Sequence, residues 1–235
     1  MPMTFCFSAL RRPLLAACLL ACTHVQAAGH FDIDDAGTLD AGQCLVEVWA
    51  GRLRSPADLN FQHVGGACAV GPVELGFNVD RASAPGSAAA VLVGPQIKWN
   101  FWGREPEATW SAAAALATSV DARHGGRAGG QLLLPLSWRA SDRLEVLVNT
   151  GADWATGTGV ATARGGAALA WTFNEYITLI AERNRAVDLW TSRLGARIAV
   201  APLTTIELSA SRSGRTDDGR LRGVVIGLNR EFSRR

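Results

Sequence analysis

The stretch LWTSRLGARIAVAPLTTIELSASRS (residues 189–213) decides the fold class, because charged residues interrupt runs that are otherwise apolar. On both sides of Pro202 the polarity alternates with a period of two, as side chains alternate between the two faces of a β-strand. The apolar parity comprises Trp190, Leu194, Ala196, Ile198, Val200, Ile206, Leu208 and Ala210, and the polar parity comprises Thr191, Arg193, Gly195, Arg197, Thr205, Glu207, Ser209 and Ser211. An arginine on the lipid face at mid-bilayer costs about 2–4 kcal/mol. We therefore expect two strands that each have one face in lipid and the other in water.

The turn at Pro202 also predicts which charges meet. An antiparallel hairpin centred on it places Arg197 opposite Glu207. Across the preceding loop, Glu182 likewise meets Arg193. Both pairs would face the water-filled side of the sheet, where solvent and opposite charge make them tolerable.

The same pattern extends over most of the chain. Extended segments of about ten residues recur, close to the length that a tilted transmembrane strand needs. We expect twelve strands, at approximately residues 43–52, 61–70, 73–81, 90–101, 109–120, 130–139, 143–153, 165–173, 176–184, 189–200, 204–212 and 221–232. Ten strands are the alternative, because the sequence signal for a strand is weak in the second and fifth segments.

The connections between these segments alternate in kind. Compact ones such as GREPE (residues 103–107) alternate with mostly longer ones such as ERNRAVD (residues 182–188). Short periplasmic turns and longer outer loops are the pattern of an outer-membrane barrel. The predicted fold class is therefore all-β, a closed antiparallel transmembrane β-barrel.

Polar residues in the other segments fall on the parity that would face the lumen. The predicted lumen-lining residues are Glu74, Lys98, Glu145, Asn149, Asp153, Glu182, Arg193, Arg197 and Glu207. Because both signs of charge occur, we expect weak ion selectivity in any channel.

Aromatic residues gather at the expected strand ends, as at the two interfaces of a membrane protein. Those expected near the periplasm are Trp99, Trp102, Trp110, Trp138, Trp171, Phe173 and Tyr176, and those expected near the outside are Trp49, Trp154 and Trp190. Core packing explains any single tryptophan, but it does not explain this sorting.

Composition excludes several other classes of protein. Only 19% of the residues are charged, and there are 25 Gly and 8 Trp among 235 residues. Without Arg11 and Arg12 of the expected leader, basic and acidic residues are equal in number. With no basic excess, we expect no nucleic-acid partner. No apolar run after the leader is long enough for a transmembrane helix.

The N-terminus reads as an export signal. Two arginines precede PLLAACLLAC (residues 13–22), and Val25 and Ala27 fit the small-residue rule for cleavage. We expect residues 1–27 to be a cleaved signal peptide, residues 28–42 a periplasmic lead-in and residues 43–235 the barrel in a bacterial outer membrane. Lipid attachment at Cys22 is the alternative to this cleavage.

Export makes the two remaining cysteines informative, because an oxidising compartment allows disulfides. A turn near Pro56 places Cys44 opposite Cys68 on neighbouring antiparallel strands. We expect a disulfide between them, with two unpaired thiols as the alternative.

The segment DIDDAGTLDAGQCLVEVWAG (residues 32–51) resembles the start of the outer-membrane family named for the meta-pathway of phenol degradation. The matching residues are Asp34, Asp35, Ala36, Gly37, Thr38, Gly42 and Glu47. The resemblance covers about a tenth of the chain, and the residues SRR after Phe232 depart from the terminal aromatic of outer-membrane strands. It implies a barrel that passes small, often apolar or aromatic compounds, and it supplies no catalytic residues. Alternatively, Asp32, Asp34 and Asp35 only solvate the lead-in.

Three functions follow from a barrel of this kind. The first is a passive channel or uptake porin for small solutes, and twelve strands leave either a narrow pore or a plugged interior. The second is a structural or adhesive barrel, whose loops carrying Arg123, Arg185, Arg212, Arg215 and Arg220 would touch lipopolysaccharide phosphates; the alternative, which we favour, is that these are solvated loops stabilised by surface charge. The third, and least favoured, is a lipid-modifying enzyme within the barrel. Outer-membrane lipid and lipopolysaccharide are the expected partners; the oligomeric state does not follow from the sequence.

Catalytic and metal chemistry have little support. Hydrolysis by serine needs a base beside the hydroxyl, and only His63 lies on an expected strand, with no family-like serine spacing. The residues DIDD lack the glycine and distal glutamate of a calcium loop, and no Cys/His spacing fits zinc. We expect no enzyme activity, no metal and no cofactor.

Overall fold

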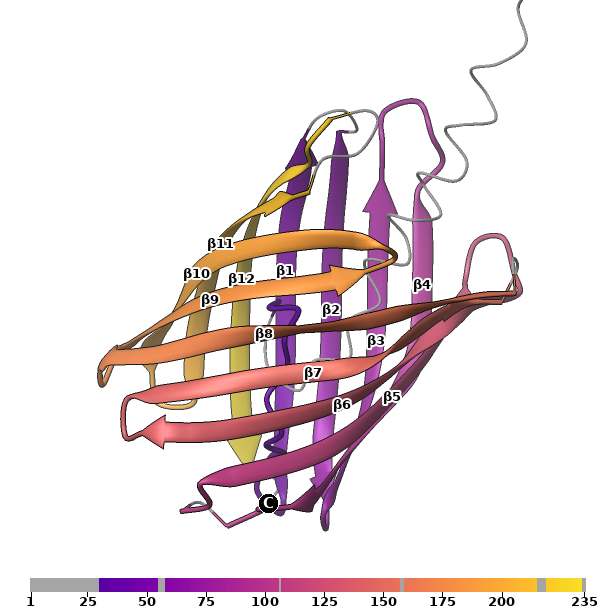
Figure 1. Ribbon diagram of the computed structural model, residues 1–235. Helices are drawn as coiled ribbons and strands as arrows, with labels where there is room; N and C mark the ends of the chain where they lie inside the picture. Colours follow the sequence, from indigo (N-terminus) through magenta and orange to yellow (C-terminus); the bar gives the residue numbers. More distant parts are fainter. Residues whose placement is uncertain (1–29, 55–57, 106, 157–158, 215–218, 234–235) are drawn as a thin grey trace, which may run out of the picture.

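The computed structural model describes residues 30–54, 58–105, 107–156, 159–214 and 219–233, which form one closed ring of twelve antiparallel strands (Figure 1). The strands are β1 (Gln43–Arg54), β2 (Leu59–Val70), β3 (Val73–Ser83), β4 (Ala90–Trp102), β5 (Trp110–Asp121), β6 (Arg127–Ser141), β7 (Leu144–Ala155), β8 (Val160–Asn174), β9 (Ile177–Ala186), β10 (Leu189–Ala201), β11 (Thr204–Ser213) and β12 (Arg222–Ser233). Each strand pairs with its neighbours in sequence, and β1 pairs with β12 to close the ring. The twelve-strand prediction is confirmed and the ten-strand alternative is wrong. Within the described ranges, no helix has the length and apolar character needed to cross a membrane.

The two ends of the barrel differ in their connections. At the end where β1 begins and β12 finishes, β2–β3, β6–β7, β8–β9 and β10–β11 are joined by two-residue turns. We call this the turn end and the opposite end the loop end; in Figure 1 the loop end lies at the top for β1 to β4 and at the right for β5 to β8.

Two connections differ from the expectation. Residues 103–109 between β4 and β5 form a longer link where a compact turn was expected. Conversely, β9 and β10 are joined by Val187 and Asp188 alone, with φ of 49° and 61°. Positive φ at both central residues is the geometry of a type I′ hairpin turn, whose twist matches that of the flanking strands. The expected long loop over residues 182–188 is therefore mostly strand.

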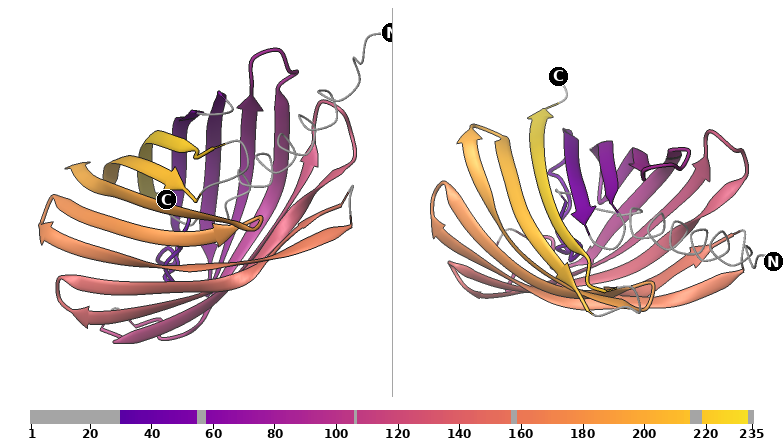
Figure 2. Two further views of the ribbon diagram at one scale, coloured as in Figure 1. Left: turned by 45° about the horizontal axis from the view of Figure 1, so that its top comes forward. Right: turned by 90° about the horizontal axis from the view of Figure 1, so that it is seen from above.

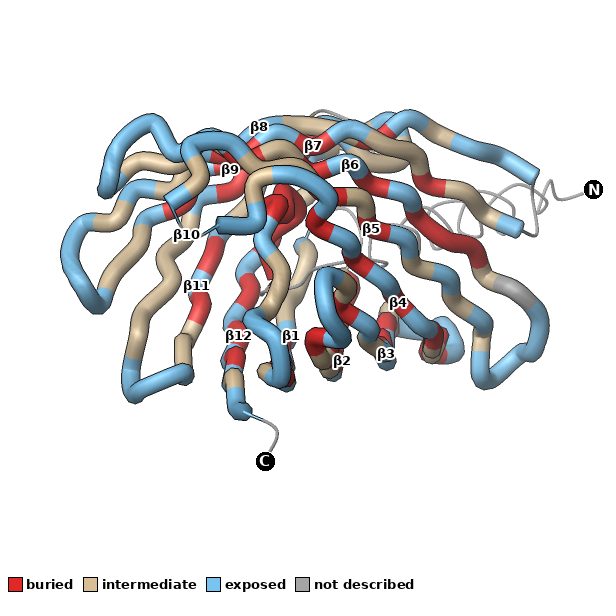
Figure 3. Tube along the Cα trace, turned by 90° about the horizontal axis from the view of Figure 1, so that it is seen from below, coloured by how far each residue is buried: buried red, intermediate tan, exposed pale blue. Residues whose placement is uncertain are grey.

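Burial alternates along the strands, as Figure 3 shows by colour. In residues 189–213 the outward Leu194 is 67% exposed, whereas the inward Glu207 is fully buried. The outer face is apolar, with Val224, Ile226 and Leu208 all exposed. These parities are the ones that the polarity pattern predicts, because one face meets lipid and the other the lumen.

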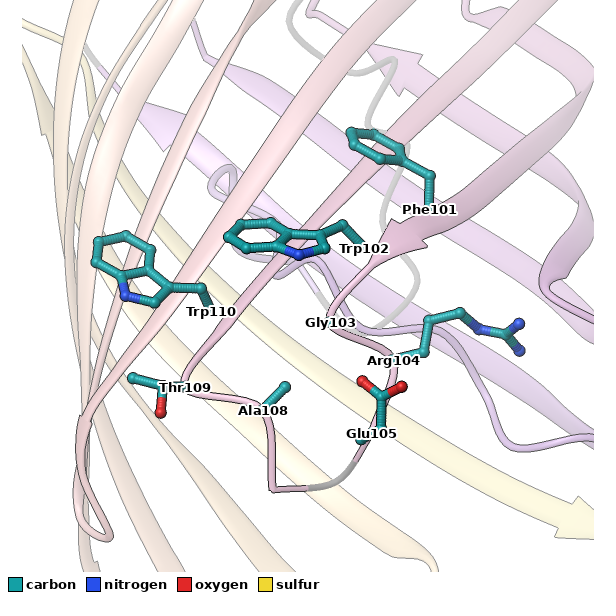
Figure 4. A pocket seen from close by; sticks show the side chains of 8 residues that line it. All are labelled: Phe101, Trp102, Gly103, Arg104, Glu105, Ala108, Thr109 and Trp110. Atoms are coloured by element: carbon teal, nitrogen blue, oxygen red, sulfur yellow. The ribbon is translucent and has the colours of Figure 1, made fainter.

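Aromatic side chains encircle the turn end. Those exposed there are Trp99, Trp102, Trp110, Trp138, Trp171, Phe173 and Tyr176. Trp110 and Trp138 stack with ring centroids 5.4 Å apart, and an irregularity in the β4–β5 register precedes Trp102. Phe101, Trp102 and Trp110 border an open hollow of about 550 Å³ at the 103–109 connection (Figure 4). This girdle has the composition of a membrane–water interface.

One aromatic residue departs from the prediction. Trp49, expected in the outer girdle, lies inside the barrel with 5% of its surface exposed. It stacks on His63 at 4.5 Å, on the neighbouring strand. The odd-numbered residues of β1 face the lumen, so parity prevents Trp49 from reaching lipid.

The disulfide prediction is confirmed. Cys44 pairs with Cys68 in the β1–β2 ladder, and their sulfur atoms are bonded. The bridge joins β1 to β2 at the turn end, directly after the point where the chain enters β1.

Candidate functional site

Ionisable side chains concentrate in the lumen. Of the residues expected to line it, the buried ones are Glu74, Lys98, Asn149, Asp153, Glu182, Arg193 and Glu207. Arg197 and Glu145 are partly exposed on the same inward parity. Arg197 lies opposite Glu207 with a 2.6 Å ion pair, and Arg193 lies opposite Glu182 at 3.3 Å. The lumen wall thus carries charges of both signs, close together.

The interior is occupied by the chain itself. Residues 30–42, which we call the inner segment, lie within the ring of strands rather than outside it, and appear in indigo in Figures 1 and 2. His30, Phe31, Asp32, Ile33, Asp34 and Ala36 are all buried. The alternative that the aspartates only solvate the lead-in is therefore wrong for Asp32 and Asp34, which are buried. Residues 1–29, including the predicted signal peptide, lie outside the described residues.

The first anchor of the inner segment is Asp32. Its carboxylate lies 2.8 Å from the Arg193 guanidinium and 3.8 Å from that of Arg164. Arg164 also bonds to Asp153, at 3.2 Å. The backbone N–H of Asp32 and that of the next residue donate to the Glu182 carboxylate at 3.0–3.1 Å. Buried charges need partners of this kind, because an unpaired charge in a low-dielectric interior is strongly destabilising.

The second anchor is Asp34. Its carboxylate lies 3.0 Å from Lys98 Nζ, and Lys98 also lies 3.5 Å from Asp35. The side-chain amide of Asn149, oriented so that both of its groups are satisfied, bonds the backbone of Asp34 at 2.8 Å. The carboxylates of the segment thus pair with basic side chains of the wall.

Further side chains hold the rest of the segment along its length. At Ala36 the N–H donates to Ser137 Oγ at 2.9 Å and the carbonyl accepts from the Asn100 amide at 2.8 Å. Further along, the Leu39 N–H donates to Glu74 at 3.2 Å. At the other end, the His30 N–H donates to Glu207 at 3.0 Å. Contacts to the segment therefore come from β3, β4 and each strand from β6 to β11.

Two apolar side chains of the inner segment, Phe31 and Ile33, lie against glycine residues of the wall. Ile33 packs against Leu147 and Ala168. A Cβ added at Gly166 would come within 2.9 Å of Ile33, and one added at Gly195 within 2.8 Å of Phe31. The small residues in the wall therefore make room for the segment, and interior packing of this kind is sensitive to single methyl groups.

The strand histidine is enclosed by carboxylates. His63 Nδ1 lies 2.7 Å from Asp80, and Nε2 lies 3.2 Å from Glu47. Trp49 covers the face of the ring. Both ring nitrogens are therefore engaged by wall residues, which indicates a structural role. Among the described residues, no group of His, Cys, Asp and Glu has the arrangement of a metal site.

Sequence reasoning missed the inner segment and Arg164. The residues FDID (31–34) alternate apolar and acidic side chains, which is the signal of an extended segment with one buried face. Arg164 lies in an Ala- and Gly-rich strand whose parity was weakly determined. Neither the alternation in residues 31–34 nor the sequence around Arg164 indicates that the segment folds back into the barrel.

A family model with the description Uncharacterised conserved protein UCP029691 matches residues 15–192, most of the chain. No curated protein matches the sequence.

Solved structures share the fold at low sequence identity. The KdgM porin, in complex with disordered oligogalacturonate, superposes with a TM-score of 0.63 at 8% identity, covering 80% of this chain and 99% of that one. The COG4313 outer membrane channel from Pseudomonas putida F1 gives 0.55 at 14% identity, covering 86% and 100%. Outer membrane phospholipase A from Escherichia coli, an active-site mutant, gives 0.52 at 10% identity, covering 79% and 89%. The fold is thus that of bacterial outer-membrane barrels, a group that holds both porins and an enzyme.

Proposed function

The chain belongs to this uncharacterised family, and we propose that it is an outer-membrane channel for passive diffusion of small solutes, with the inner segment as its gate. In outer-membrane barrels the short turns face the periplasm. The turn end, where both β1 begins and β12 finishes, would then be periplasmic, and the inner segment would enter the lumen from that side.

The observation that carries this proposal is the way in which the segment is held. The hydrogen bonds described above join residues 30–39 to the wall through side chains, and these residues belong to none of the twelve strands. The segment can therefore leave without breaking a hydrogen bond between strands. Its departure would replace buried ion pairs with hydrated ones and would open a water-lined path.

The charges of the wall favour small polar solutes. With the inner segment removed, Glu47, Glu74, Asp80, Asp153, Glu182 and Glu207 would remain, together with Lys98, Arg164, Arg193 and Arg197. Carboxylates outnumber basic groups among these buried and partly buried side chains, but each basic group has a carboxylate neighbour. We expect weak selectivity, with a small preference for cations.

A second class of solute is favoured by an apolar patch in the lumen. Trp49, Leu59, Phe61, Ala82 and Val225 form a buried cluster in the loop-end half of the barrel. Such a patch would suit solutes with an aromatic or aliphatic part, as the resemblance to the phenol meta-pathway family also implies. Uptake of a neutral sugar and of an aromatic acid into proteoliposomes would separate the two classes.

An engineered cross-link tests the gate directly. The Ala36 N–H lies 2.9 Å from Ser137 Oγ, so the double variant Ala36→Cys/Ser137→Cys places two thiols at a contact between segment and wall. Planar-bilayer recordings of the mature chain should show low or intermittent conductance. The oxidised double variant should be silent, and a reductant should restore current. The parent, which has only Cys44 and Cys68 after the leader, is the control for the reductant.

The outcomes separate the channel from the gate. If the cross-linked variant conducts like the parent, the segment is not the gate. If neither the reduced variant nor Asp32→Asn/Asp34→Asn, which weakens both anchors, conducts or admits solute, the channel function is wrong.

A further inference from the structure

Three arginines form a row on the outer face of the barrel at the loop end. Arg54 of β1 lies directly opposite Arg222 of β12, and Arg222 lies directly opposite Arg212 of β11. All three side chains are exposed. Arg222 has the parity of Val224 and Ile226, which are exposed on the same strand. The row therefore projects outward from the wall, away from the lumen.

This arrangement is unfavourable for the protein alone. Neighbouring strands are about 4.8 Å apart, and like charges directly opposite each other are destabilising. On the adjoining loop, the carboxylate of Asp58 pairs with Arg52 at 2.5 Å and also interacts electrostatically with Arg54. The hydrogen bond from Arg52 lowers the pKa of Asp58, so this carboxylate is ionised, but its single negative charge is shared between Arg52 and Arg54. Among the described residues, the row is thus a local excess of positive charge.

On β10, β11 and β12 the surface next to the row is apolar. Two residues further toward mid-barrel, on the same face, Val224 pairs with Ala210, and Ala210 pairs with Leu194; on β1 the residue opposite Val224 is Arg52, which pairs with Asp58. Val224 and Leu194 are among the most exposed apolar side chains of the barrel. A cationic row bordering an apolar surface matches a ligand whose anionic headgroup is attached to acyl chains.

A fourth arginine continues the basic surface. Ser192 of β10 pairs with Arg212 on one side and with Arg183 on the other. The Arg183 guanidinium lies 5.1 Å from the centroid of the Trp190 ring and 3.4 Å from Ser192 Oγ. Trp190 is exposed and belongs to the aromatic residues expected at the outer interface. The row therefore lies at headgroup level.

We propose that Arg54, Arg212 and Arg222 bind the phosphate groups of lipid A, the glycolipid anchor of lipopolysaccharide in the outer leaflet, while its acyl chains cover Val224 and Leu194. Arginine suits this role because its planar, always charged guanidinium donates paired hydrogen bonds to phosphate. A phosphate between opposed arginines would also remove their mutual repulsion. The proposal rests on the outer-membrane location, but not on conduction or on the gate.

Binding of purified lipid A to the detergent-solubilised mature chain tests this assignment. Native mass spectrometry would compare three probes: bis-phosphorylated lipid A, enzymatically dephosphorylated lipid A, and inorganic phosphate. The test variant is Arg54→Gln/Arg212→Gln/Arg222→Gln. The matched control, Arg81→Gln/Arg104→Gln/Arg123→Gln, removes the same number of exposed charges elsewhere. Heat-modifiable mobility on gels verifies that both variants fold.

We expect the parent and the control variant to bind lipid A at least tenfold more tightly than the test variant, and to bind dephosphorylated lipid A as weakly as the test variant does. Equal binding of lipid A by the test variant would overturn the proposal. So would equal binding of the dephosphorylated form, or equally strong binding of inorganic phosphate, which would indicate an anion site without lipid. Asp217 and Asp218 lie outside the described residues; a gain of lipid A binding only on their replacement by Asn would show that they, rather than lipid, neutralise the row.

Discussion

Lys98 and Asp34 form a buried ion pair that joins the barrel wall to the inner segment, with Nζ 3.0 Å from Oδ2. Lys98 is the sole lysine of the chain and lies on β4, whereas Asp34 lies on a segment that belongs to no strand. The pair therefore couples two parts of the molecule that the strand ladder leaves unconnected.

Removal of Lys98 is expected to release the segment rather than unfold the barrel. Loss of one partner of a buried ion pair costs about 3–5 kcal/mol when the other charge stays buried. Here Asp34 can instead move into water, so the penalty is limited to the free energy that docks the segment. In Lys98→Gln, amide hydrogen exchange over residues 31–39 should accelerate at least tenfold, while the barrel's thermal transition changes little. Arg230→Gln, at an exposed turn-end site, is the control. Unchanged exchange would mean that Asp34 does not anchor the segment.

Truncation of Ile33 tests the apolar contribution to docking. Ile33 packs against Leu147 and Ala168, and removal of a buried isoleucine side chain to alanine typically costs about 2–5 kcal/mol. Ile33→Ala should therefore raise the open-channel time in bilayer recordings and make the segment accessible to protease. Leu179→Ala removes an exposed side chain from the outer face and should do neither. Identical recordings for the two variants would contradict the packing argument.

The barrel wall was predictable because one rule, the alternation of strand faces, acts at every residue. In residues 189–213 a slip of one residue would put Arg193 and Arg197 into lipid, so the register is strongly determined. The turn at Pro202 and the Cys44–Cys68 pair then fix neighbouring strands. Where the signal weakens, as around Arg164, parity could not be assigned.

The inner segment was not predictable in the same way. Its position depends on charges that are far apart in sequence, such as Asp32 with Arg193 and Asp34 with Lys98. Aspartates in a polar lead-in normally stay in water. The sequence alone does not indicate that basic side chains of the wall lie buried in the lumen, where they can pair with these aspartates. The prediction for Trp49 was wrong because it rested on the position of this residue near a strand end and not on the face of the strand to which its side chain points.

The two faces of β11 give a test of the membrane assignment. Leu208 is exposed near the middle of the strand, whereas Thr205 has the inward parity. An arginine facing lipid at mid-bilayer costs about 2–4 kcal/mol. Leu208→Arg should lower the free energy of unfolding in lipid vesicles by about that amount, and Thr205→Arg should change it much less. Urea titration followed by tryptophan fluorescence measures both. Equal losses would argue against a lipid-facing Leu208.

The disulfide is expected to stabilise the barrel without positioning the inner segment. It links residues separated by 24 positions, and closure of a loop of that size stabilises a protein by about 3 kcal/mol through the unfolded chain. The β1–β2 ladder continues from Cys44 to Leu53 without it. In contrast, the anchors of the segment come from β3 to β11, as with Glu74 and Glu207. Cys44→Ala/Cys68→Ala should therefore unfold at lower urea concentration, yet keep the parent's hydrogen exchange over residues 31–39. Faster exchange in this variant would show that the bridge also holds the start of β1 where the segment needs it.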